Sequence, residues 1–169
     1  MSRRIAAGAV MAAVAVASCA RVGPVSRPSP DGAVRIYSVA GLSFEAPAAW
    51  SADGDPRKVK LASPGGEAVL EVRATAVAGP VDDCLVGAGE ALERGAASLS
   101  GVRRHGSTFA GKKAIAQEAD QGGWHGWAWA TCDRGEQYRV FLSGRSPVSR
   151  ETIEVQRRLV ATARLGGAP

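Results

Sequence analysis

Apolar and polar side chains alternate along much of the chain after residue 34, with the two-residue period of half-buried β-strands. In the segment LSFEA at 42–46, for example, every second side chain is apolar. The last strands follow one another across short Gly-containing turns, which predicts an antiparallel meander, with 133–135 as a three-residue hairpin loop. Strands are expected at 35–39, 42–46, 59–62, 68–77, 102–108, 112–119, 124–132 and 136–143.

Two other segments carry apolar residues at steps of three and four, the spacing of amphipathic helices. The first helix is expected at 82–99 and begins with two aspartates, which suit the positive end of the helix dipole. Each of its three interior glycines costs up to about 1 kcal/mol relative to alanine, so this helix depends on packing. The second is expected at 150–164, after Ser149 as N-cap.

The order of strands, helix, strands, helix lacks the βαβ alternation of a doubly wound parallel sheet. The predicted fold class is therefore α+β, an antiparallel β-sheet with a central and a C-terminal helix packed on it. A single domain is expected over 35–166. The 46% hydrophobic and 22% charged residues are typical of a globular protein and exclude disorder, collagen and coiled coils. The longest apolar stretch precedes residue 21, which excludes a multispanning membrane protein.

Residues 1–18 have the pattern of a signal peptide, with Arg3 and Arg4 before an apolar stretch. The sequence VASC at 16–19 resembles the bacterial lipobox. This resemblance implies cleavage before Cys19 and acylation of that cysteine, so that the protein is held on a membrane by its lipid chains. An ordinary secretory signal and a short transmembrane anchor are the alternatives.

The lipobox reading sets expectations for the rest of the mature chain. Residues 19–34 would be the lipidated cysteine and a flexible tether rich in Pro and Gly, reaching about 50 Å. Loss of Arg3 and Arg4 lowers the net charge from +5 to +3, so no nucleic-acid partner is expected. The expected location is the bacterial cell envelope, facing the periplasm, and Ala20 in place of Asp favours the outer membrane.

Three cysteines are present, and lipidation of Cys19 leaves an even pair in an oxidising compartment. A disulfide between Cys84 and Cys132 is therefore predicted, with two buried thiols as the alternative. The chain has no Cys-x-x-Cys motif, and its only histidines, His105 and His125, lack a zinc-finger spacing. No metal site and no cofactor are expected.

The strand at 124–132 carries the candidate binding face. By alternation His125, Trp127 and Trp129 share one face, and Cys132 lies on the other with small residues that allow a helix to approach. The three rings are either a surface for a partner or ligand, since Trp is favoured in binding hot spots, or ordinary sheet packing. A basic group is either a patch for anionic ligands or a solvated strand edge; its members are Arg103, Arg104, Lys112 and Lys113.

Motifs for catalysis are missing from the sequence. It has no Gly-x-Ser-x-Gly elbow, no P-loop and no dinucleotide fingerprint. A hydrolase would need His105 or His125 to meet a serine and a carboxylate in space. The protein is therefore not expected to be an enzyme.

The segment GLSFEAP at 41–47, followed by Trp50, and the segment GKKA at 111–114 resemble the Mog1/PsbP-like domain. This domain occurs in bacterial lipoproteins such as the LpqN/LpqT group and the DcrB-like proteins, and the resemblance covers about 36–165. It implies a binding, adaptor or assembly role without shared catalytic residues. The first expected function is a lipid-anchored envelope protein with a non-catalytic domain that binds another envelope protein. A carrier or sensor of a small apolar or lipidic ligand is the alternative, and a hydrolase is the weakest.

Overall fold

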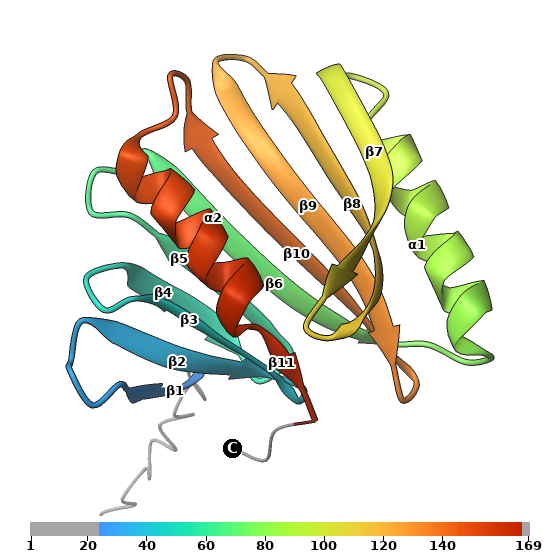
Figure 1. Ribbon diagram of the computed structural model, residues 1–169, viewed down its shortest axis with the longest axis horizontal. Helices are drawn as coiled ribbons and strands as arrows, with labels where there is room; N and C mark the ends of the chain where they lie inside the picture. Colours follow the sequence, from blue (N-terminus) through green and yellow to red (C-terminus); the bar gives the residue numbers. More distant parts are fainter. Residues whose placement is uncertain (1–23, 167–169) are drawn as a thin grey trace, which may run out of the picture.

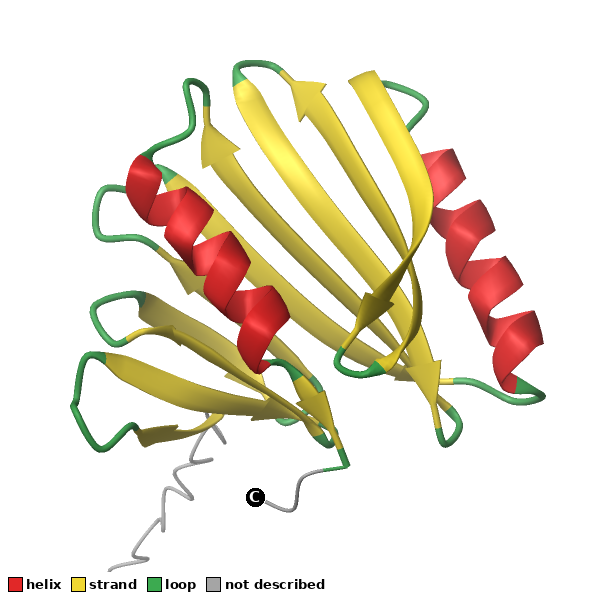
Figure 2. Cartoon of the chain, in the orientation of Figure 1, coloured by secondary structure: helices red, strands yellow, loops and turns green. Residues whose placement is uncertain are grey.

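The structure, a computed structural model, describes residues 24–166 (Figure 1). The expected signal peptide, Cys19 and the start of the expected tether lie outside the described residues. The described chain is α+β, with two helices and only antiparallel strand pairing, so the predicted fold class is confirmed (Figure 2). It differs from the expectation in having two sheets instead of one.

The smaller sheet has four strands in the order β1-β2-β3-β11. Its strands are β1 (Val25–Pro28), β2 (Val34–Val39), β3 (Leu42–Pro47) and β11 (Arg164–Leu165). The predicted alternation at 42–46 is borne out, because Leu42, Phe44 and Ala46 are buried and their neighbours are half-buried. Phe44 stacks on Tyr37 of β2, with the ring centroids 5.8 Å apart.

The larger sheet has seven strands in the order β4-β5-β6-β10-β9-β8-β7. The β4 strand was missed by the alternation pattern because its sequence SADGD has no large apolar residue, and it forms only by pairing with β5. The strands are β4 (Ser51–Asp55), β5 (Lys58–Ala62), β6 (Ala68–Ala76), β7 (Ser100–Phe109), β8 (Lys112–Gln121), β9 (Trp124–Asp133) and β10 (Glu136–Arg145).

The main core fills the space between the two sheets. The inner face of the seven-stranded sheet, defined here as the face that carries Leu70, Leu142 and Trp129, packs against the four-stranded sheet and helix α2 (Arg150–Thr162). Ser149 caps α2 as predicted, since its side-chain oxygen accepts a hydrogen bond from the backbone N–H of Thr152. Buried Leu159 of α2 belongs to the same core.

Tyr138 of β10 ties the two sheets together. Its hydroxyl donates a hydrogen bond of 2.7 Å to the carbonyl of Ala40, in the turn between β2 and β3. Removal from water, followed by the nearby carboxylates of Glu136 and Asp133, raises the pKa of Tyr138. The phenol therefore stays protonated and keeps donating across the physiological pH range.

Helix α1 (Val81–Gly95) covers part of the outer face of the seven-stranded sheet, defined as the face that carries Cys132 and Phe141. The helix ends at Gly95, before the expected residue 99, with Ala96 as its C-cap. Close approach explains one interior glycine: a Cβ at Gly89 would lie 2.9 Å from Cδ1 of Ile115 in β8. Within residues 24–166, neither helix has the length and apolar character needed to cross a membrane.

The expected flexible tether is wrong for residues 25–34. Residues 25–28 form β1, which pairs with 35–38 of β2, and the backbone then turns back through Ser29 and Gly32. The prolines obscured this strand in the sequence. They are tolerated because β1 is the edge of its sheet, where a missing N–H breaks no ladder. The folded domain therefore begins about ten residues before the expected boundary at 35.

The hairpin between β9 and β10 has a two-residue turn, not the expected three-residue loop. Asp133 pairs with Glu136, and both turn residues have positive φ, 48° at Arg134 and 77° at Gly135. Two such angles define a type I′ turn, which matches the twist of the strands. The sequence analysis expected a longer loop because it assigned the left-handed conformation to Gly135 alone, whereas Arg134 adopts it as well.

Replacing Arg134 by asparagine is expected to raise the free energy of unfolding by about 1 kcal/mol. Asparagine tolerates the left-handed conformation better than arginine, and Asn-Gly is the preferred type I′ pair. The substitution loses an ion pair with Asp133 at 3.8 Å, in which the arginine side chain is largely exposed, and the guanidinium beside Gly166. Urea unfolding measures the change, and Arg139→Asn in the adjoining strand is a comparison that should not stabilise. An unchanged or lower stability of Arg134→Asn would contradict a strained turn.

Candidate functional site

The strand β9 places His125, Trp127 and Trp129 on the inner face, as their alternation predicts. Trp129 is only 6% exposed and stacks on Phe109, with the ring centroids 5.7 Å apart. It is enclosed by the core and offers little surface to a ligand. The expectation of a three-residue binding face is therefore wrong for Trp129, because the end of β7 folds over it.

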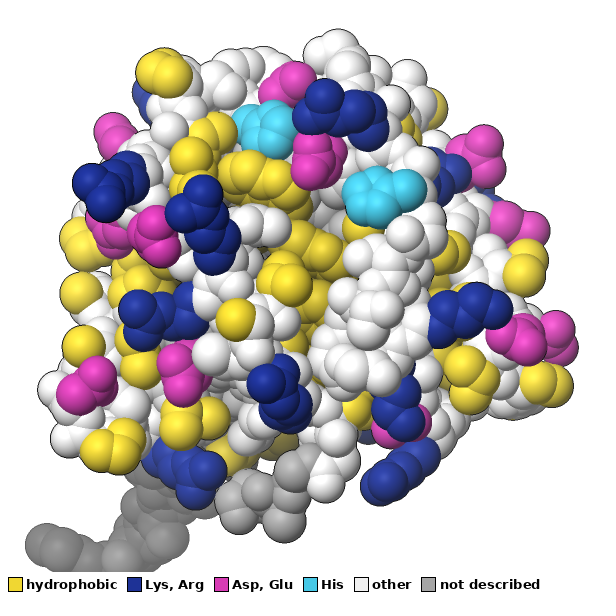
Figure 3. All heavy atoms as spheres, viewed as in Figure 1, with side chains coloured by type: hydrophobic (Ala, Val, Ile, Leu, Met, Phe, Trp, Pro, Cys, Tyr) yellow, Lys and Arg dark blue, Asp and Glu magenta, His cyan; other side chains and the backbone are white. Residues whose placement is uncertain are grey.

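Trp127 and His125 lie nearer to solvent than Trp129. Both are half-buried, and the His125 ring meets the Trp127 ring edge-on at 4.5 Å. Nδ1 of His125 lies 2.8 Å from Oδ1 of Asp120, which fixes the imidazole. Figure 3 shows hydrophobic side chains reaching the surface between α2 and β7. We call Trp127 and His125, together with the hydrophobic surface between α2 and β7, the α2–β7 strip.

A hydrolytic site would need a serine beside one of the histidines. In the described part of the chain, the recorded side-chain partner of His125 is Asp120, and no serine hydroxyl bonds to it. Within residues 24–166 no three His, Cys, Asp or Glu side chains are grouped to hold a metal ion. Nothing in the geometry around His125 supports the hydrolase alternative.

Each basic side chain of the candidate basic group has an acidic neighbour. Arg103 lies 2.7 Å from Glu118, and Lys112 lies 3.0 Å from Asp133. Arg104 and Lys113 are paired more loosely, with Glu93 at 3.7 Å and Asp82 at 3.6 Å. These pairs neutralise the group locally, which favours the interpretation as a solvated strand edge.

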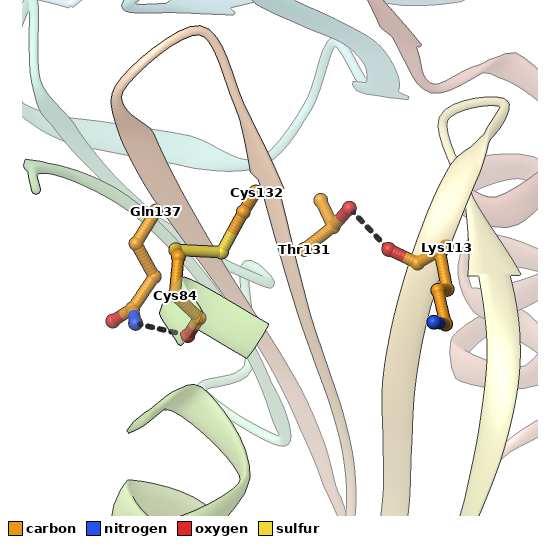
Figure 4. Close-up of a disulfide and its surroundings, with 5 residues drawn as sticks. All are labelled: Cys84, Lys113, Thr131, Cys132 and Gln137. Carbon is orange, nitrogen blue, oxygen red and sulfur yellow. Dashed lines mark hydrogen bonds between the residues drawn. A yellow bond between two sulfur atoms is a disulfide. The ribbon is translucent and has the colours of Figure 1, made fainter. Parts of the chain in front are cut away.

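The predicted disulfide joins Cys84 in the first turn of α1 to Cys132 in β9 (Figure 4). Around it lies a small satellite core, in which Leu85 is buried and Val77 packs alongside. Only three side chains of α1 are buried, namely Cys84, Leu85 and Ala88. The second half of the helix covers the sheet less completely.

The outer face beyond α1 has apolar hollows that the sequence analysis did not identify. The side chain of Phe141 in β10 is 47% exposed there, between two of them. One hollow, of about 170 Å³, lies over Gly126 and Ala128 and is bounded by Phe141, Trp124 and Leu99; we call it the Phe141 hollow. A third hollow, of about 650 Å³, opens between α1 and the β7–β8 hairpin.

A signal for the Phe141 hollow does exist in the sequence. In β10 the outward positions are Gln137, Arg139, Phe141 and Ser143, so a large apolar ring stands among polar side chains. Across the ladder, β9 offers only Gly126 and Ala128 to cover that ring. A bulky residue opposite small ones leaves space, but its position relative to α1 could not be predicted.

No protein-family model and no curated protein matches this chain. Among solved structures, cyanobacterial PsbP (CyanoP) from Synechocystis sp. PCC 6803 is similar over 93% of this chain and 98% of its own. The TM-score is 0.52 and the sequence identity is 12%. The domain has a PsbP-like fold. This confirms the fold part of the resemblance, since identity this low shows the fold alone.

A second solved structure resembles the PsbP-like domain. It is a protein from Bacteroides thetaiotaomicron VPI-5482, with a TM-score of 0.53 and 12% identity. The match covers 85% of this chain and 48% of the other, so this chain spans about half the length of that protein.

Proposed function

We propose that this protein is a lipid-anchored component of a bacterial cell envelope, related to the LpqN/LpqT or DcrB-like lipoproteins, whose PsbP-like domain binds another envelope protein. The observation that carries the binding role is the α2–β7 strip, where Trp127 is left partly exposed beside His125. Aromatic side chains that are packed from below and open above are favoured anchors in protein interfaces. The role is non-catalytic.

The anchor is supported by the lipobox-like sequence that ends at Cys19. The first strand begins at Val25, so the five residues 20–24 separate the acylated cysteine from the folded domain. The six Cα–Cα steps from residue 19 to residue 25 span at most about 20 Å even when extended. The domain would thus be held close to the membrane surface, where it meets other membrane-bound proteins, with outer-membrane sorting favoured by Ala20.

The periplasmic location is supported by the Cys84–Cys132 disulfide. Structural disulfides persist in oxidising compartments and are rare where thioredoxin and glutathione keep thiols reduced. An adaptor that faces the periplasm would keep this crosslink throughout its life.

Site-specific photocrosslinking in cells tests the proposed interface. Arg103 lies on the inner face in register with Trp127, two strands away, and its side chain is exposed. A photoreactive residue at 103 is expected to give one specific protein adduct. Trp127→Ala is expected to weaken capture by about thirtyfold, the loss typical of a hot-spot residue.

The matched control carries the photoreactive residue at Val86, which is exposed on α1 beside the groove between α1 and the β7–β8 hairpin. It should not give the same adduct. An adduct that forms equally from positions 86 and 103, or one that survives Trp127→Ala in a folded domain, would contradict the strip as the binding surface.

We propose a carrier or sensor of a small apolar ligand as the second candidate function. The Phe141 hollow favours it, because this hollow is largely apolar and opens to solvent. In this proposal the ligand lies on the outer face of the sheet, and not against Trp127 and Trp129 on the inner face as the sequence analysis expected.

A further inference from the structure

The Phe141 hollow combines an apolar floor with two polar groups that lack partners. The Phe141 ring leaves no room for a side chain at Gly126, because a Cβ there would lie 3.1 Å from Cε2 of the ring. Trp124 forms another wall, and the guanidinium of Arg145 lies 5.7 Å from its ring centroid. Among the described residues, no charged side chain lines the hollow.

Gln117 of β8 carries one of the two polar groups, and this residue is only 5% exposed. Its carbonyl oxygen accepts two hydrogen bonds from Arg104, at 3.1 and 2.9 Å. This contact fixes the amide and leaves its NH₂ group without a partner in the described chain. Every described side-chain nitrogen or oxygen that is fully buried has a hydrogen-bond partner. The unpaired NH₂ group of Gln117 is therefore not fully buried and reaches accessible space. Gln117 is one of the residues that line the hollow.

Ser143 of β10 is the second polar group, only 9% exposed. Its hydroxyl makes no hydrogen bond within residues 24–166, and Ser143 too lines the hollow. In the ladder Ser143 faces Gly126, and Gln117 faces Ala128, so the two polar groups stand at opposite ends of the small-residue floor. Both donors reach accessible space in the hollow, so each can donate to a ligand that enters it.

We propose that the Phe141 hollow binds one neutral aromatic ring that carries a hydrogen-bond acceptor. A cavity of about 150 Å³ lined by apolar side chains accepts benzene, so a hollow of about 170 Å³ has the size of a single ring. The ring lies against the Phe141 and Trp124 side chains, while the Gln117 amide donates to its acceptor and the Ser143 hydroxyl bonds a polar group at its opposite edge. The absence of charged lining residues selects a neutral ligand. This inference deepens the second candidate function and does not rest on the α2–β7 strip.

Such a ring can arrive as a free small molecule or as a tyrosine side chain of another polypeptide. The probes are therefore p-cresol, toluene as the same ring without an oxygen, and N-acetyltyrosinamide. Binding is followed by ¹H–¹⁵N NMR of the folded domain. We expect p-cresol to shift the amide signals of Gly126, Ala128 and Phe141, and toluene to bind at least about fivefold more weakly because it forms no hydrogen bond.

Two variants examine the mechanism, and a third serves as the control. Gln117→Met, which keeps the length of the side chain but removes the amide donor, should weaken p-cresol about fivefold and leave toluene unchanged. Ala119→Leu adds a larger side chain at the lining of the hollow and should abolish binding of both probes while the domain stays folded. Val86→Ala, in the separate groove between α1 and β7–β8, should leave both affinities unchanged.

Binding of N-acetyltyrosinamide as tight as that of p-cresol would indicate a tyrosine side chain, and p-cresol binding alone would indicate a free molecule. The inference is overturned if p-cresol does not shift the signals around Gly126, or if the shifts persist in a folded Ala119→Leu variant. Either failure leaves crosslinking from position 103 unaffected, so it is distinguishable from failure of the proposed adaptor role.

Discussion

Replacing both Cys84 and Cys132 by alanine is expected to lower the free energy of unfolding by roughly 4 kcal/mol. The crosslinked residues are 48 positions apart in sequence, and closing a loop of that length in the unfolded chain has about this effect in the chain-entropy treatment. The expected loss is large compared with the marginal stability of a single domain. Urea unfolding followed by circular dichroism measures it.

The loss should be concentrated at α1, because little else attaches this helix to the sheet. The satellite core around the disulfide is small, and only three α1 side chains are buried. Amide hydrogen exchange in α1 should therefore accelerate more than exchange in β9 or β10 of the same variant. Wild-type protein treated with a reductant is the matched comparison. A double variant as stable as the wild type, with α1 equally protected, would show that packing alone holds the helix.

Trp129→Ala is expected to destabilise the domain by about 3–5 kcal/mol, the typical result of removing a large aromatic side chain from a core. Trp129 is 6% exposed and stacked on Phe109, so its removal leaves a cavity in the main core. Thermal unfolding at fixed protein concentration and pH measures the effect.

Trp127→Ala should be compared with Trp129→Ala, because Trp127 lies two positions away on the same face but is only half-buried. Its expected cost is about 1–2 kcal/mol, which leaves a folded domain with a weakened interface. Equal destabilisation by the two substitutions would place both rings in the core and remove the α2–β7 strip as a binding surface. A negligible effect of Trp129→Ala would contradict the buried position of that ring.

Local patterns in the sequence predicted most of the larger elements. Alternation identified β3 and the meander of β8, β9 and β10, and the three- and four-residue spacing identified both helices with small errors at their ends. The same reasoning placed Cys84 and Cys132 close together, because small residues on their face of β9 admit a helix. These features depend on side-chain period, which is local.

Features that arise from pairing or from tertiary cover were not predictable in this way. The β1 and β4 strands lack a useful apolar period and form because a neighbour offers them a ladder. Alternation correctly grouped Trp127 with Trp129, but only the fold shows that β7 covers Trp129 and leaves Trp127 half-buried. The Phe141 hollow depends on where α1 ends relative to β10, which no single segment encodes.

Native mass spectrometry of the protein released gently from its own membranes tests the proposed envelope adaptor most directly. The expected species is the chain of 169 − 18 = 151 residues from Cys19 onward, with acyl groups on that cysteine and two hydrogens fewer for the disulfide. It should be released together with a second protein. A chain that still begins at Met1, or one that carries an unmodified Cys19 and is released alone, would contradict the lipid-anchored adaptor.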